Sequence, residues 1–87
     1  MTTKPPSRIK QTPEKGLEAI AYASVQGIPT VEPHDRDRLG YNVWRWLATK
    51  NDTLELAVRS AAANLLVSEE QALHHIRESL RSQGITL

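Results

Sequence analysis

The sequence predicts an all-α fold, a small domain of three to four helices. Apolar residues recur at helical spacing in several segments, and residues typical of helix caps stand before those segments. The chain has 87 residues and no cysteine, so one core without disulfides must hold it together. Residues 1–11 contain Pro5 and Pro6 and almost no apolar side chains, which predicts a disordered basic tail. Residues 12–87 are expected to form a single helical domain.

The first helix is expected over residues 13–26. Thr12 is a suitable N-cap, and Pro13 follows in the first turn, where a missing N–H costs nothing. Apolar residues then recur at helical spacing as far as Gly27. The segment 28–33, IPTVEP, has two prolines and two β-branched residues, so it should form an extended connector rather than a helix.

A second helix is expected to begin between Asp35 and Asp37 and to end near Lys50. Its apolar residues fall on two opposite sides of a helical wheel. Leu39, Val43, Trp46 and Leu47 share one side, and Tyr41, Trp44 and Ala48 share the other. One side should cover the core, while the other must meet a further helix such as the one at 13–26, the N-terminal segment, or another molecule.

The third and fourth helices are expected to be joined by a tight corner of about four residues. The third has Asp52 as N-cap with Glu55 in capping-box spacing, and its apolar stripe runs to Leu65. The fourth begins after Ser68, which has Gln71 in the same spacing. Gly84 follows the end of this helix. Residues 28–32 and 85–87 are both β-prone, and whether they pair as strands stays open.

The stretch AANLLVSEEQALHHI, residues 62–76, resembles the helix-turn-helix of bacterial transcription regulators. A small residue, a leucine, a turn that ends in valine and serine, and a further helix follow in the order of that family. The matching positions are Ala62, Leu65, Val67, Ala72 and Ile76. The chain departs from the family at Leu66, where glycine is usual because the backbone takes a positive φ.

The resemblance implies a small DNA-binding regulator of transcription that places its last helix in the major groove of double-stranded DNA. Helix-turn-helix proteins usually read two half-sites as dimers, so a homodimer is implied as well. The expected DNA contacts at the last helix are Ser68, Glu69, Gln71, His74, His75 and Arg77. Further contacts are expected from the tail, through Lys4, Arg8 and Lys10.

The alternative function is a small protein-binding module, an adaptor or inhibitor of the kind that mobile elements encode, without nucleic-acid binding. Its expected partner interface is the second apolar face of the second helix, made of Tyr41, Trp44, Arg45 and Ala48. The charge distribution bears on the choice. The five acidic residues of 51–87 outnumber its three arginines, which weakens attraction to phosphates. Clustering of Asp52, Glu55, Glu69 and Glu70 on one exposed face would exclude a duplex.

Other function classes lack their residues. No serine is coupled to a base by a motif, and the four glycines do not form a phosphate-binding loop, so we expect no enzyme and no cofactor. His74 and His75 are neighbours and point about 100° apart on a helix, so we expect no metal site. The absence of cysteine and of an apolar run of about 20 residues predicts a cytoplasmic protein without a membrane span.

Overall fold

The computed structural model describes residues 13–87, with side chains from Gly16 onward. Its elements are the helices α2 (Pro13–Ser24), α3 (Pro33–Thr49) and α4 (Leu54–Arg59), the 3₁₀ turn η1 (Ala62–Asn64) and helix α5 (Glu69–Ser82). This part of the chain contains no strand beyond one isolated bridge, so the predicted all-α fold is confirmed. The tail at 1–11 and its boundary with the domain, and Thr12 as the first N-cap, lie outside the described residues.

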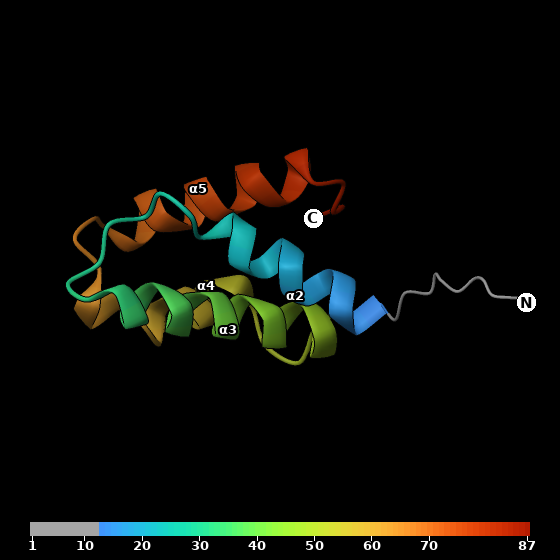
Figure 1. Cartoon of the computed structure of the whole chain (residues 1–87), viewed down its shortest axis with the longest axis horizontal. Coiled ribbons are helices and arrows are strands. Elements are labelled where there is room, and N and C mark those ends of the chain that lie inside the picture. Colours follow the sequence, from blue (N-terminus) through green and yellow to red (C-terminus); the bar gives the residue numbers. More distant parts are fainter. Residues whose placement is uncertain (1–12) are drawn as a thin grey trace, which may run out of the picture.

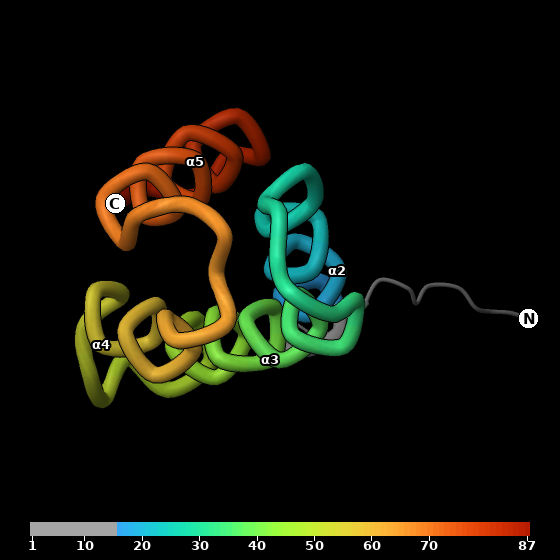
Figure 2. The backbone as a smooth tube through the Cα atoms, turned by 90° about the vertical axis from the view of Figure 1, so that its left-hand side faces the viewer, coloured from blue at the N-terminus to red at the C-terminus, as the bar shows by residue number. Residues whose placement is uncertain are grey.

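The four helices surround one apolar core (Figures 1 and 2). Helices α2 and α4 lie on opposite sides, and each of them contacts both α3 and α5. The buried apolar side chains come from every helix and from the connector after α2. They are Ala21, Val25, Ile28, Leu39, Val43, Leu47, Leu54, Val58, Ala61, Ala72, Ile76 and Leu80. The side of α3 predicted to cover the core does so through Leu39, Val43 and Leu47, with Trp46 partly buried beside them.

Helix α2 ends close to the expected position, and α3 begins earlier than expected. Gly27 has φ 89°, a conformation that favours glycine, and it redirects the chain into the extended segment before α3. Glu32 is the N-cap of α3, Pro33 occupies the first turn, and Asp35 completes a capping box with Glu32. The predicted start at 35–37 was therefore too late, because the proline was assigned to the connector instead of to the first turn.

Helix α4 is shorter than predicted and has a different cap. Thr53, not Asp52, is its N-cap, and the Thr53 side chain accepts a hydrogen bond from the Leu56 backbone N–H at 3.2 Å. The helix ends at Arg59 instead of continuing to Leu65. The whole segment Ser60–Ser68 separates α4 from α5, so the predicted corner of about four residues is wrong.

Long-range backbone pairing accounts for this early end. Thr30 and Leu65 form an antiparallel bridge. The Val31 N–H donates to the Asn64 carbonyl at 2.9 Å, and the Leu66 N–H donates to the Pro29 carbonyl at 3.0 Å. Leu65 is extended as it follows η1, and these bonds tie it to the connector after α2, an arrangement that a continuous α-helix cannot accommodate. Residues 28–32 thus pair with residues 64–66 and not with 85–87.

The backbone at Leu66 also differs from that of the regulator family. Lys50 is the one non-glycine residue with a positive φ between residues 13 and 87, so Leu66 does not adopt the glycine conformation of the family's turn. The described residues thus do not form the tight turn that the resemblance implied.

Helix α5 begins as predicted. Ser68 is its N-cap, and the capping box with Gln71 is present in both directions. Gly84 follows the end of the helix with φ 93°. Within residues 13–87, no helix combines the length and the apolar character needed to cross a bilayer.

Candidate interaction surfaces

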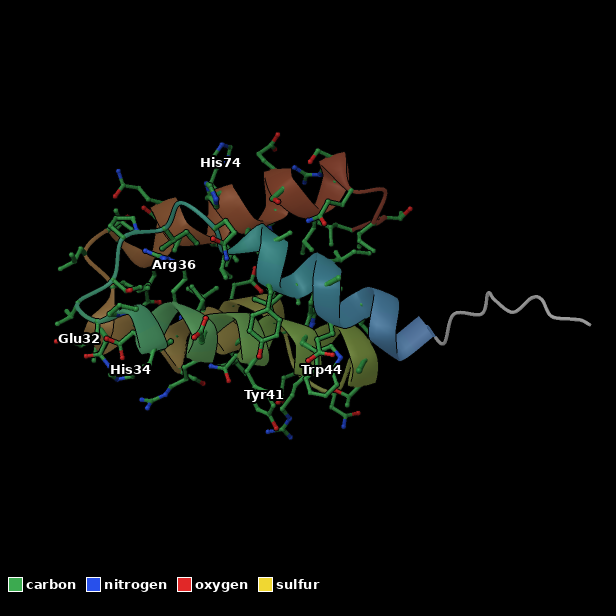
Figure 3. All side chains as sticks on the ribbon, viewed as in Figure 1. Glu32, His34, Arg36, Tyr41, Trp44 and His74 are labelled. Carbon is green, nitrogen blue, oxygen red and sulfur yellow. The ribbon has the colours of Figure 1, made fainter. Side chains whose placement is uncertain are left out.

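The first half of α5 carries the residues predicted to contact DNA. Ser68, Glu69, Gln71, His74 and His75 are all exposed at its N-terminal side, and the labelled His74 points away from the domain in Figure 3. The tail residues of the same prediction, Lys4, Arg8 and Lys10, lie outside the described residues.

Several of these side chains are held by partners within the domain. The Gln71 side-chain oxygen accepts a hydrogen bond from the Ser68 backbone N–H at 3.1 Å, as part of the capping box. The Nε2 atom of His75 lies 2.7 Å from the Gln26 carbonyl oxygen and so joins α5 to the end of α2. The Gln71 side-chain oxygen and His75 Nε2 are therefore already engaged, whereas the Gln71 amide nitrogen and His75 Nδ1 have no partner among the described residues.

The arginines of α4 and α5 are each paired with a glutamate of the same two helices. The pairs are Arg59 with Glu69 at 3.4 Å, Arg77 with Glu55, and Arg81 with Glu78 at 2.7 Å. Glu70 adds a carboxylate that no described cation pairs with. The two helices therefore present a face with no surplus positive charge for phosphate groups.

Three acidic residues gather between α4 and α5. Glu55, Glu69 and Glu70 line one depression with Arg59, Val58 and Leu73. The backbone N–H of Glu55, and then the charge of Arg77, lower the pKa of the Glu55 carboxyl. The charged side chains that line this depression are thus three acidic residues and one arginine, an excess of negative charge that opposes the approach of a duplex.

Asp52 does not line that depression. It lines another one, together with Glu55, Lys50, Arg77 and Arg81. Glu55, Glu69 and Glu70 thus share one depression, and Asp52 shares a second one with Glu55.

The outward side of α3 carries the predicted partner interface. We call Arg38, Tyr41, Trp44, Arg45 and Ala48 the outer α3 surface. Tyr41 is 45% exposed, and Arg45 and Ala48 are exposed as well. The Tyr41 and Trp44 ring centroids lie 5.5 Å apart with an interplanar angle of 59°. Figure 3 shows both aromatic residues on α3, on the side of the molecule away from α5.

Trp44 connects this surface to the interior. Its side chain is half-buried and packs against the core cluster. Its Nε1 atom is buried and has no hydrogen-bond partner among the described residues. A buried donor without a hydrogen-bond partner is unusual in a folded domain.

Helix α2 covers only one flank of α3. The ring of Tyr22 lies against Gly40, where a Cβ would come within 2.6 Å of Tyr22 Cδ1. Burial, and then the charges of Glu18 and Asp37, raise the pKa of Tyr22 above its usual value. Helix α2 therefore packs on the Gly40 side of the second apolar face of α3 and leaves Tyr41 45% exposed.

The sequence did not single out Arg38 as a member of the outer α3 surface. Arg36 donates to the Ile28 carbonyl at 2.9 Å, and the three arginines of α4 and α5 are ion-paired. Arg38 and Arg45 make no ion pair and no side-chain hydrogen bond with residues 16–87. The sequence did contain a signal for this pair, because a spacing of seven residues places both side chains on one side of a helix.

Residues 13–87 contain no group of three or more histidine, aspartate or glutamate side chains that could hold a metal ion. Comparisons with models of protein families, with curated proteins and with solved structures find no significant match to this chain.

Proposed function

We propose that this chain is a small protein-binding module that engages its partner through the outer α3 surface. The observation that carries the proposal is an exposed tyrosine in contact with a half-buried tryptophan, beside the exposed Arg45 and Ala48 on the outer side of α3. Tyrosine, tryptophan and arginine are the residue types that dominate the energy of protein interfaces.

DNA binding through α5 is the weaker candidate on electrostatic grounds. A DNA-binding protein gains most of its affinity from lysine and arginine contacts with phosphates. In α4 and α5 each arginine already has a glutamate partner, and three carboxylates line one depression between the helices. A duplex placed along α5 would meet more negative than positive charge.

A homodimer through the outer α3 surface is disfavoured by its arginines. Two antiparallel copies of α3 that cross near Tyr41 would set Arg38 of one copy against Arg45 of the other, because these residues lie on either side of the crossing point. Like charges that face each other across a helix pair are destabilising. A different protein is therefore the expected partner.

Affinity capture from cells that naturally express the chain tests the proposal. The wild-type chain is compared with Tyr41→Ala, and with Leu66→Ala as a matched control, since Leu66 is 62% exposed and lies outside the outer α3 surface. We expect at least one protein that is recovered with the wild type and the control, and that is lost with Tyr41→Ala. Equal recovery with all three chains would contradict the proposal.

A duplex titration addresses the DNA function directly. We expect no saturable binding of mixed-sequence duplex by fluorescence anisotropy at low salt. Saturable binding that weakens steeply with added salt, and that is reduced further by Arg77→Ala, would favour the DNA-binding function instead.

A further inference from the structure

We infer that the partner segment is an amphipathic helix with two carboxylates about one heptad apart, and that it lies along α3. This inference rests on the proposed function, because it names the chemistry that fits the same surface. Three features of α3 support it, namely the spacing of its exposed residues, the unpaired state of its two arginines and the length of its outer side.

The exposed residues of α3 follow a heptad pattern. His34, Tyr41 and Ala48 are spaced seven apart, and Asp37 and Trp44 repeat the same interval at the neighbouring position. Apolar residues at two alternating positions of a heptad form the seam along which a second helix packs at a small angle. Tyr41, Trp44 and Ala48 supply the apolar part of such a seam.

Arg38 and Arg45 flank this seam, also one heptad apart. They are separated by about 10 Å along the helix axis. Residues at the flanking positions of a helix pair form salt bridges that select the partner. Since neither arginine has an acidic partner among residues 16–87, both are open to carboxylates of another molecule.

The acidic residues near the seam do not remove the preference of Arg38 and Arg45 for carboxylates of a partner. Asp37 lies on the same side of α3 as Trp44, toward α2, and its charge, with that of Glu18, contributes to the raised pKa of Tyr22. Arg38 and Arg45 lie on the opposite side of Tyr41, at about 100° from Asp37 around the helix. The surface thus has an acidic edge toward α2 and a basic edge away from it. An asymmetric surface of this kind specifies the orientation of a docked helix.

A helix suits this surface better than an extended chain or a nucleic acid. The helix α3 has 17 residues and is about 25 Å long, and His34, Arg38, Tyr41, Arg45 and Ala48 are exposed along its outer side. An extended peptide cannot add to this surface as a β-strand, because the backbone N–H and C=O groups of α3 are already bonded within the helix. Two arginines are also few for a phosphate backbone.

Selection from a helical peptide library tests the inference. The probe is a set of peptides of about 20 residues, long enough to form isolated helices, with an alanine–leucine seam. Two flanking positions seven apart are varied among Glu, Lys and Gln. The baits are the wild-type chain, Tyr41→Ala, the double variant Arg38→Glu/Arg45→Glu, and the control double variant Arg59→Glu/Arg81→Glu with the same net charge.

We expect the wild type and the Arg59/Arg81 control to enrich peptides with Glu at both varied positions by about tenfold or more over Lys. The Arg38→Glu/Arg45→Glu bait should enrich Lys at those positions, a reversal that an unfolded protein cannot produce. Selection of Lys or Gln by the wild type overturns the inference. A preference of the Arg38→Glu/Arg45→Glu bait for Glu at the varied positions overturns it as well.

The same experiment separates this inference from the proposed function. Selection that depends on Tyr41 but ignores the charges overturns the acidic helix and leaves a protein-binding surface in place. No selection by any bait, together with equal protein recovery by the wild type and Tyr41→Ala in affinity capture, overturns both. Binding of a mixed-sequence single-stranded oligonucleotide that is lost in Tyr41→Ala, without peptide selection, overturns the inference in favour of a nucleic-acid partner.

Discussion

The side-chain amide of Asn64 donates a hydrogen bond to Asp35 Oδ1 at 3.1 Å, and this contact joins the start of α3 to the turn between α4 and α5. Asp35 is 4% exposed, and its other oxygen accepts from the Glu32 backbone N–H at 2.9 Å. The same carboxylate therefore caps α3 and anchors η1. Beside it, Thr30 bridges Leu65. This junction sets the direction of the chain as it enters α5.

Asn64→Ala should lower the free energy of unfolding by about 1 to 3 kcal/mol, since it leaves a buried carboxylate oxygen without its donor. Chemical denaturation with urea measures the change. Asn51→Ala is the matched control, because Asn51 is exposed and contributes only its backbone N–H to a hydrogen bond. A loss for Asn64→Ala no larger than that of the control would show that the junction does not stabilise the fold.

Gly40→Ala and Gly16→Ala should have opposite effects. At position 40 the added Cβ meets the Tyr22 ring, and overpacking of this kind costs about 1 to 3 kcal/mol. At position 16 nothing lies within 4 Å, so the higher helix propensity of alanine should stabilise by about 0.5 to 1 kcal/mol. Thermal unfolding measures both. In a Tyr22→Ala background the penalty of Gly40→Ala should disappear, and its persistence would contradict the Tyr22 contact.

Thr53→Ala should destabilise the domain by about 1 kcal/mol, because it removes the N-cap of α4. Asp52→Ala should change stability by less than about 0.5 kcal/mol, since Asp52 is exposed and is not the cap. Denaturation of the two variants compares the cap seen in the structure with the cap that the sequence predicted. A larger loss for Asp52→Ala would favour the sequence-based assignment.

The Glu55 carboxyl should make the stability of the domain depend on pH. In the folded state its pKa is lowered from the ordinary value of 4.5, first by a hydrogen bond from its own backbone N–H and then by the charge of Arg77. The ionised form is therefore favoured by folding, so its contribution is present above about pH 4.5 and is lost as the pH falls through the lowered pKa.

Glu55→Gln should consequently lower the melting temperature at neutral pH, and the difference from the wild type should close in acid. Glu70→Gln is the control, because Glu70 is exposed and has no ion-pair partner among the described residues. A difference between Glu55→Gln and the wild type that stays constant with pH would show that ionisation of Glu55 does not contribute.

Local patterns predicted much of this fold. The capping box of Ser68 and Gln71 at the start of the last helix was confirmed, and so was the glycine that follows its end. The two-sided character of α3 was also confirmed, since the side chains of Leu39 and Tyr41 are buried and exposed as expected. Such features depend on residues three to four apart, which the sequence displays directly.

Features that depend on distant residues were not predicted. The alanine-rich stretch after Arg59 has strong helix propensity, but the bonds of residues 64–66 to the connector after α2 override it. The pairing of Arg77 with Glu55 across two helices was likewise not predicted. The exposure of Tyr41, Arg45 and Ala48 could be predicted because these residues share one helix face, and Arg38 was omitted because an arginine at a single exposed position is common.

Site-specific photo-crosslinking in cells that naturally express the chain tests the central claim most directly. A photoreactive phenylalanine replaces Ala48 on α3 in one variant and His74 on α5 in another, and both positions are exposed. The account predicts a crosslink to a second protein from position 48, and none to DNA from position 74. Crosslinks to DNA from position 74, with none to protein from position 48, would contradict it.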